Sequence, residues 1–239
     1  MTRRAVALTG LVLVLLASGC EADRPAARQP RVGPEPSSAA TPTAVPLGIA
    51  PTSRHSSAPP ARPAPVLTVR YRVEVRVDDM TTRSFPGVVH RTLADSRGWR
   101  RARFELVSDA HATYTIVIAE ASEVDRLCLP YDTFGKYSCQ NGPVVAINAD
   151  RWRSATPEWT GDLATYRQML INHEVGHLLG QHHPESPQCK VPGQAALLMS
   201  QQSTELGGCL PNPWPRGEEI ARAARHDEPL APPYSPPPG

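Results

Sequence analysis

The sequence predicts one α+β domain, in which a twisted mixed sheet is combined with a long central helix and a C-terminal helix. The clearest strand is residues 66–77, where apolar residues alternate with charged or polar ones. A two-residue period is typical of a strand with one buried face. The clearest helix is residues 163–179, which we expect to pass through the core. The folded part, residues 66–226, has the length of a single domain with one core.

The other expected elements lie between and after these two. Residues 85–97 predict a helix with Pro86 in its first turn, where proline is tolerated. Four short apolar runs are expected to complete the sheet, namely residues 104–107, 114–119, 127–131 and 144–148. A helix over residues 218–225 is expected to close the domain.

The first twenty residues resemble a bacterial lipoprotein signal peptide. Arg3 and Arg4 precede an apolar run at residues 5–17, which is too short to span a membrane comfortably. The run ends in Ala-Ser-Gly-Cys, which resembles a lipobox, so we expect cleavage before Cys20 and lipidation of its thiol. The protein would then sit on the outer face of the cytoplasmic membrane. The alternative is an ordinary signal peptide and a secreted protein.

Both flanks of the predicted domain are rich in proline. Residues 21–65 contain eleven prolines and few large apolar residues, so we expect a disordered tether. Residues 227–239 are expected to form a disordered tail. The balance of 25 Lys+Arg against 23 Asp+Glu gives no indication of nucleic-acid binding. We expect a monomer.

The chain has five cysteines, an odd number. If Cys20 is lipidated, four remain, and an exported protein is expected to pair them in two disulfides. Four cysteines allow three pairings, of which we favour the two local ones, Cys128–Cys139 and Cys189–Cys209. Cysteine ligation of zinc is the alternative, but no C-x-x-C spacing is present.

Residues 173–183 contain the most informative pattern, His-Glu-Val-Gly-His-Leu-Leu-Gly-Gln-His-His. Residues four apart share a helix face, so His173 and His177 can direct their imidazoles to one point. Gly180 suits a left-handed residue that ends the helix and lets His183 supply a third nitrogen. Three protein ligands leave one position of a tetrahedral zinc ion open, which is typical of catalytic sites.

Glu174 lies beside the expected metal position rather than on it. A general base that takes a proton from a zinc-activated water must occupy such a place. The alternative reading is a polar helix whose histidines face solvent. The intervening Val175, Leu178 and Leu179 are apolar and argue against it.

These residues resemble the metzincin zinc peptidases, which share H-E-x-x-H-x-x-G-x-x-H and a later methionine turn. The segment Ala-Ala-Leu-Leu-Met-Ser at residues 195–200 offers Met199 for that turn. Many metzincins carry a Tyr two residues after the methionine, where this chain has Gln201. Gln201, another side chain or no residue therefore takes that role. The resemblance implies a metzincin-like fold, with an extended peptide bound along an edge strand, for which residues 127–131 are the candidate.

The sequence also resembles an uncharacterised family of secreted domains from high-GC Gram-positive bacteria. The matching stretches are residues 161–168, 172–177 and 208–215. Trp214, in the last stretch, is expected either to line the substrate pocket or to serve as a packing residue.

Together these observations predict an extracytoplasmic zinc metallopeptidase that cuts peptides or proteins with a zinc-activated water and Glu174 as the base. One alternative is a non-catalytic zinc lipoprotein that binds cell-wall polymer or a partner protein. Another is a zinc amidase that acts on peptidoglycan peptides.

Overall fold

The computed structural model describes residues 66–231 of the chain. The predictions for Cys20, for the signal peptide over residues 1–20 and for the tether over residues 21–65 lie outside the described residues. So do residues 232–239 of the predicted tail.

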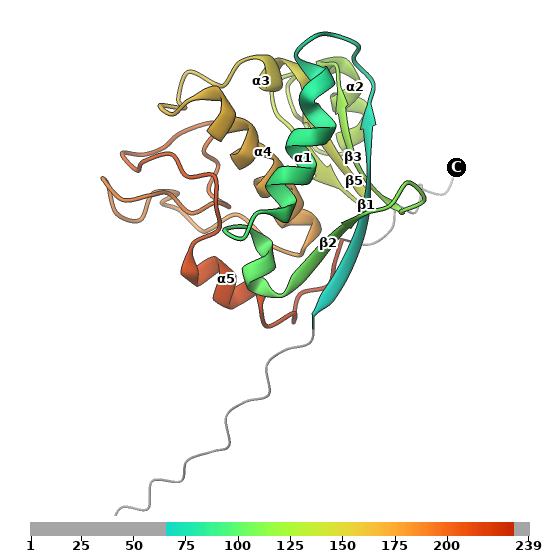
Figure 1. The fold of residues 1–239 in the computed structure, drawn as a ribbon. Helices are drawn as coiled ribbons and strands as arrows, with labels where there is room; N and C mark the ends of the chain where they lie inside the picture. Colours follow the sequence, from blue (N-terminus) through green and yellow to red (C-terminus); the bar gives the residue numbers. More distant parts are fainter. Residues whose placement is uncertain (1–65, 232–239) are drawn as a thin grey trace, which may run out of the picture. The chain divides into compact units, whose positions relative to one another are not determined.

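Five strands form one sheet in the order β2-β1-β3-β5-β4 (Figure 1). The strands are β1 (Leu67–Val75), β2 (Phe104–Ser108), β3 (Tyr114–Ala119), β4 (Cys139–Asn141) and β5 (Val144–Asn148). The first three and β5 are mutually parallel, whereas β4 runs antiparallel to β5 at one edge. The prediction of an α+β domain with a mixed sheet is therefore confirmed.

Strand β1 has different neighbours along its two halves. β2 pairs with the first half and β3 with the second, so Tyr71 lies opposite both Ser108 and Tyr114. The chain therefore passes from one side of β1 to the other within residues 109–113.

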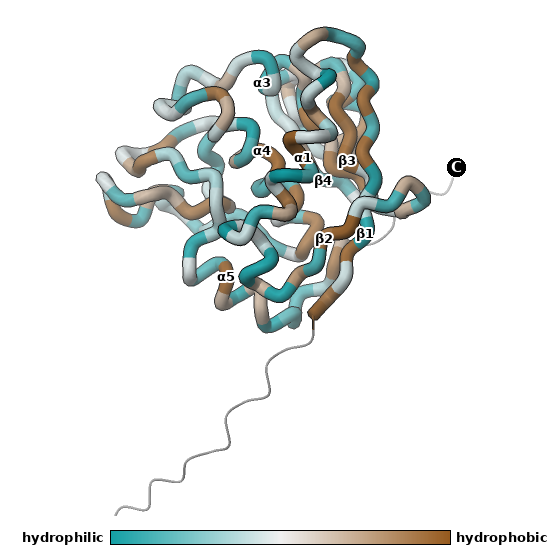
Figure 2. Tube along the Cα trace, viewed as in Figure 1, coloured by the Kyte–Doolittle hydropathy of each residue, from teal (hydrophilic) through white to brown (hydrophobic). Residues whose placement is uncertain are grey.

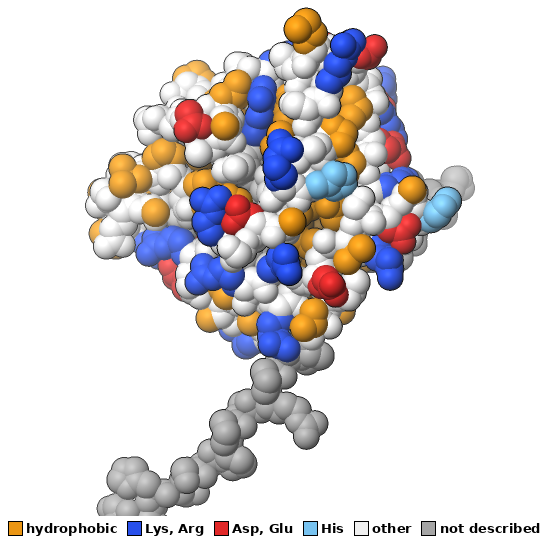
Figure 3. Space-filling view, in the orientation of Figure 1, with side chains coloured by type: hydrophobic (Ala, Val, Ile, Leu, Met, Phe, Trp, Pro, Cys, Tyr) orange, Lys and Arg blue, Asp and Glu red, His pale blue; other side chains and the backbone are white. Residues whose placement is uncertain are grey.

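Helices cover both faces of the sheet. They are α1 (Phe85–Ala94), α2 (Ala121–Cys128), α3 (Ala149–Arg153), α4 (Leu163–Leu178) and α5 (Gly217–Ala223), with 3-10 turns at Thr82–Ser84 and Trp99–Ala102. Alternate residues of β3 serve two cores: Ile116 and Ile118 pack with α1 and α4, whereas Val117 packs with α2. Figure 2 shows the apolar residues gathered along the strands. On the face shown in Figure 3, basic, acidic and apolar side chains are interspersed.

The expected strand at residues 127–131 is wrong. Leu127 and Cys128 are the last residues of α2, and the chain after them is irregular. Val124 and Cys128, four residues apart, are the buried positions of that helix, and a short apolar run does not distinguish a helix end from a strand. The edge strand at this side of the sheet is β4 instead, which pairs antiparallel with β5.

The other helices and strands end within a few residues of their predicted boundaries. The helix predicted over residues 85–97 ends at Ala94, because Asp95 is extended with ψ 136°. Helix α3 and the three-residue strand β4 were not predicted, since neither is long enough to show a period.

Two disulfides join the predicted local pairs, Cys128–Cys139 and Cys189–Cys209, which confirms that pairing. The first ties the end of α2 to β4, and the second closes the loop that contains the Met199 segment. At the other end of the domain, the Ala231 N–H donates to the Leu178 carbonyl at 2.9 Å, so residues 227–231 lie with the folded part. Within residues 66–231, no helix combines the length and apolarity needed to cross a bilayer.

Candidate metal centre and cleft

Helix α4 carries the histidine motif through the interior of the domain. Asp162 caps it by accepting a hydrogen bond from the Thr165 N–H at 2.7 Å, which satisfies a donor of the first turn. Residues 169–176 are buried on every side of the helix. The motif is therefore part of the core, and its polar side chains require partners or a ligand.

Gly180 ends the helix as the sequence predicts. Its φ of 78° is left-handed, and a Cβ there would lie 2.8 Å from the Pro229 carbonyl oxygen. The Gln181 N–H donates back to the Gly176 carbonyl at 2.9 Å and closes the reversal. This turn returns the chain so that His183 faces the two histidines of the helix.

The three imidazoles converge through their Nε2 atoms. His183 Nε2 lies 3.1 Å from the Nε2 of His173 and 3.1 Å from that of His177. Zinc–nitrogen bonds of about 2.0–2.1 Å at tetrahedral angles place two ligand nitrogens about 3.3 Å apart. The observed spacing therefore fits a metal ion at the shared point, and the three residues form a group that could hold one.

Hydrogen bonds on the far side of two rings fix the tautomer. His173 Nδ1 lies 2.9 Å from the Leu198 carbonyl oxygen, and His177 Nδ1 lies 2.8 Å from that of Gln181. A carbonyl oxygen only accepts, so both Nδ1 atoms carry the proton. Each neutral ring then directs the lone pair of Nε2 toward the shared point, as a metal ligand requires.

The surroundings also keep the rings neutral. Burial lowers the pKa of His173 well below its ordinary value, and the two neighbouring imidazoles add to that effect. Burial lowers the pKa of His177 to about 4 and also lowers that of His183. Neutral imidazole is the form that binds metal ions.

Glu174 faces the same cleft and is 6% exposed. Burial raises the pKa of its carboxyl group to about 8, and no hydrogen bond from the described residues offsets that rise. A cation beside the carboxyl group would lower its pKa again. The geometry thus leaves both carboxylate oxygens free to bind a water molecule or a ligand in the cleft.

Met199 lies in a tight turn and packs on α4. The Ser200 N–H donates to the Leu197 carbonyl at 3.1 Å, so Leu198 and Met199 are the central residues of that turn. A Cβ at Gly176 would lie 2.5 Å from the Met199 sulfur. Only glycine fits at position 176 while Met199 keeps this position.

Glu219 of α5 fixes this turn. Its carboxylate accepts hydrogen bonds from the Leu198 N–H at 3.0 Å, the Met199 N–H at 2.8 Å and the Arg216 N–H at 2.8 Å. Burial raises the pKa of Glu219, and these three donors oppose the rise. The Leu198 N–H donates to Glu219, and the Leu198 carbonyl accepts a hydrogen bond from His173. Glu219 therefore positions a candidate metal ligand through Leu198.

A cleft of about 590 Å³ opens over the three histidines. It is lined by residues 131–134 and 137–140, by α4, and by residues 201–204 after the turn. Cys139 and Gln140 of the edge strand β4 are part of this lining. A sheet edge thus lies beside the candidate metal centre, as the sequence predicts, but it is formed by β4 and not by residues 127–131.

The structure also shows where three other residues near the predicted site lie, namely Gln201, His182 and Trp214. Gln201 lies against a candidate ligand, with its side-chain amide 3.3 Å from His183 Nδ1. His182 lines the cleft without joining the histidine group. Trp214 is not among the residues that line the cleft and packs against Arg97 at 4.2 Å. The idea that Trp214 forms the substrate pocket is therefore wrong, and the packing alternative holds.

Three converging histidines, two of them with fixed tautomers, lie beside a buried glutamate in an open cleft and define a candidate metal centre. Residues 61–213 match the family described as protein of unknown function (DUF3152), and the chain belongs to this family. No curated protein matches the sequence significantly.

Nineteen chains of solved structures show some likeness to this one. One comes from a structure titled "GM1 bound form of the ECX AB5 holotoxin", with a TM-score of 0.38 and 15% identity over 67% of this chain and 80% of that chain. A TM-score of 0.38 is too low to support an argument about fold or function.

Proposed function

We propose that this protein is a zinc-dependent peptide hydrolase of the metzincin type. The observation that carries the proposal is the convergence of three Nε2 atoms beside Glu174 at the floor of an open cleft. A structural metal site gains nothing from a buried carboxylate that no group of residues 66–231 binds, whereas a hydrolytic site needs a base there.

His173, His177 and His183 would hold the metal ion, which would polarise the scissile carbonyl and acidify a water molecule. Glu174 would accept the proton of that water at a carboxylate oxygen and later donate it to the leaving amine. Met199, in the turn fixed by Glu219, would serve as the methionine of a metzincin-type turn.

The substrate would bind as an extended peptide along β4. Among the described strands β4 pairs only with β5, and its Cys139 and Gln140 line the cleft. Addition of a strand to such an edge is a common mode of peptide recognition. The Cys128–Cys139 disulfide holds the edge to α2 and would keep it in place while the peptide binds.

Two disulfides support a location outside the cytoplasm, since thiols are kept reduced inside the cell. We propose that the protein acts there, attached through Cys20 as a lipoprotein. Loss of detergent partitioning in Cys20→Ala would support the anchor, and unchanged partitioning would contradict it.

The experiment that tests the function is cleavage profiling of the zinc-loaded protein on proteome-derived peptides. We expect new peptide termini with the wild type and few or none with Glu174→Ala. Equal profiles for the two proteins, at equal zinc content, would contradict the proposal.

A further inference from the structure

Arg151 lines the cleft, and its side chain has neither an ion-pair nor a hydrogen-bond partner among residues 66–231. It lies in α3, the short helix that follows β5, and its side chain lines the same cleft as the histidines. Its Nε is buried and has no hydrogen-bond partner, and no carboxylate of residues 66–231 forms an ion pair with it. Burying a polar group without a partner costs free energy, and here the unpaired donor belongs to a cation that lines the cleft, so a ligand in the cleft is its candidate partner.

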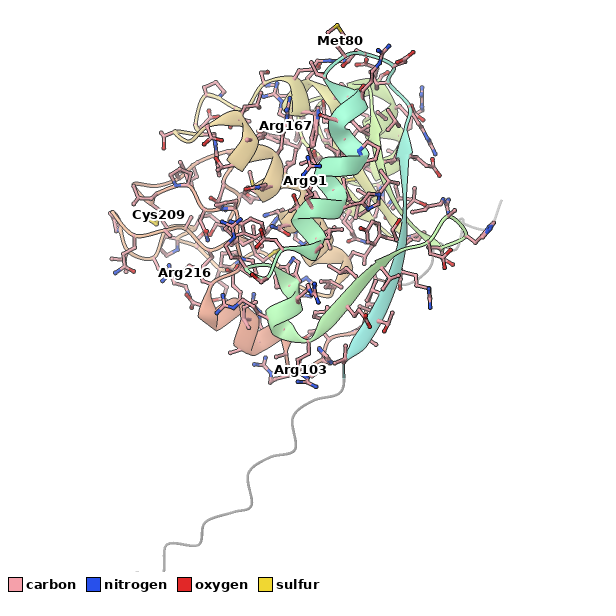
Figure 4. The ribbon with its side chains drawn as sticks, viewed as in Figure 1. Met80, Arg91, Arg103, Arg167, Cys209 and Arg216 are labelled. Atoms are coloured by element: carbon pink, nitrogen blue, oxygen red, sulfur yellow. A yellow bond between two sulfur atoms is a disulfide. The ribbon has the colours of Figure 1, made fainter. Side chains whose placement is uncertain are left out.

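The contrast with neighbouring arginines makes this clearer. Arg153, two residues later, forms ion pairs with Asp79, Glu120 and Asp150. Arg167 of α4, labelled in Figure 4, donates from Nε to the Trp152 carbonyl at 2.8 Å. That bond also fixes α3 against α4, so Arg151 is held in the cleft by an ordered helix rather than by a loose loop.

Two carboxyl groups, those of Asp132 and Glu174, also line the cleft, but neither forms an ion pair with Arg151. Met169 and Leu170 of α4 line the cleft one turn before the histidine motif, and Ser203 lines it after the Met199 turn. The Tyr166 hydroxyl lies 2.9 Å from Ser203 Oγ, and it is close enough to Arg151 for that positive charge to lower its pKa. Burial raises the pKa of Tyr166, and Arg151 opposes that rise while Glu174 and Glu158 add to it.

We propose that Arg151 binds a carboxylate of the substrate, so that the enzyme prefers peptides with an acidic side chain or a free C-terminal carboxylate at one fixed position. A guanidinium group matches a carboxylate with two parallel hydrogen bonds, and partial burial strengthens them. The proposal rests on the proposed function in that a peptide must occupy this cleft.

The test uses fluorescein-labelled Ala-Ser octapeptides that carry one Glu, or one Gln at the same position, with amidated C termini. The unsubstituted octapeptide, as free acid and as amide, separates a terminal carboxylate from a side-chain carboxylate. Each pair is measured with the full-length protein as wild type, Arg151→Gln, Arg151→Lys and the exposed control Arg101→Gln. Zinc content and thermal midpoint establish that each variant is folded.

For one pair we expect the wild type to prefer the carboxylate over its neutral partner by on the order of 10- to 100-fold in kcat/KM. Arg151→Gln should reduce that ratio to near one, mainly by slowing the acidic peptide, and Arg151→Lys should retain part of it. Arg101→Gln should match the wild type. A wild type without any carboxylate preference, or an Arg151→Gln protein that keeps it, overturns the proposal.

A binding measurement separates this proposal from the proposed function. The same peptides are titrated against zinc-loaded Glu174→Gln protein, with and without Arg151→Gln, by fluorescence polarisation. Charge-dependent binding that requires Arg151, without cleavage by the wild type, would support the carboxylate site and contradict the peptidase. Absence of any Arg151-dependent difference in both assays overturns the carboxylate site itself.

Discussion

Replacement of Gly176 by alanine tests whether Met199 packs directly on the helix that carries the histidines. A Cβ at this position would lie 2.5 Å from the Met199 sulfur and 2.8 Å from Trp99 Cζ2, whereas non-bonded heavy atoms ordinarily settle at about 3.5–4.0 Å. Trp99 and Met199 are 1% and 0% exposed, so neither can move without disturbing the core.

Two effects of opposite sign set the magnitude. Helix propensity alone favours alanine over glycine by about 1 kcal/mol. Overpacking of a buried site costs about 1–3 kcal/mol, and two contacts this short place the cost at the upper end. We therefore expect Gly176→Ala to lower the free energy of unfolding by about 2 kcal/mol, which corresponds to roughly 4–8 °C in Tm.

Urea denaturation followed by tryptophan fluorescence measures this change. Gly217→Ala is the matched control, because a Cβ there meets nothing within 4 Å, and its stability should be unchanged or slightly higher. In a Met199→Ala background the cost of Gly176→Ala should shrink, since the sulfur contact is gone. A Gly176→Ala protein as stable as the wild type would refute the packing of Met199 on α4.

Two further predictions concern groups that support the site and the fold. Glu219→Gln replaces an accepting oxygen with an N–H₂ group that faces backbone donors, so it should lower the free energy of unfolding by about 2–3 kcal/mol, measured by urea denaturation. It should also weaken metal affinity, because Glu219 acts on His173 through Leu198. Unchanged stability would contradict the role assigned to Glu219. Hydrogen bonds from Thr81, and then from Arg153, hold the pKa of Asp79 well below its ordinary value. Its contribution is therefore fully present above the unfolded pKa of about 3.9 and is lost progressively as the pH falls from there toward the lower folded pKa. Thermal midpoints measured from pH 7 to pH 3 should fall less steeply in Asp79→Asn than in the wild type, and parallel curves would show that Asp79 adds nothing.

The parts of the site that the sequence predicts are those that depend on local geometry. His173 and His177 are one helical turn apart, and Gly180 is where a left-handed residue must end that turn, so their arrangement follows from spacing alone. The disulfide pairs follow similarly, because each joins cysteines near in sequence.

The supporting residues could not be predicted, because their contacts join distant segments. Glu219 binds backbone groups twenty residues earlier, and Gly176 is required by Met199 rather than by the helix itself. The edge strand β4 is three residues long and reads Cys-Gln-Asn, which has no apolar period. Arg151 resembles any surface arginine until the fold places it in the cleft.

The central claim is that Glu174 is the base of a zinc hydrolase, and Glu174→Gln tests it most directly. The measurement is peptide cleavage per bound zinc, with zinc content determined on the same samples and His177→Ala as the variant that should lose the metal. The account predicts about one zinc per chain in the wild type and in Glu174→Gln, and cleavage that falls by about 10²–10⁴-fold in Glu174→Gln. Full cleavage activity in a Glu174→Gln protein that retains its zinc would contradict it.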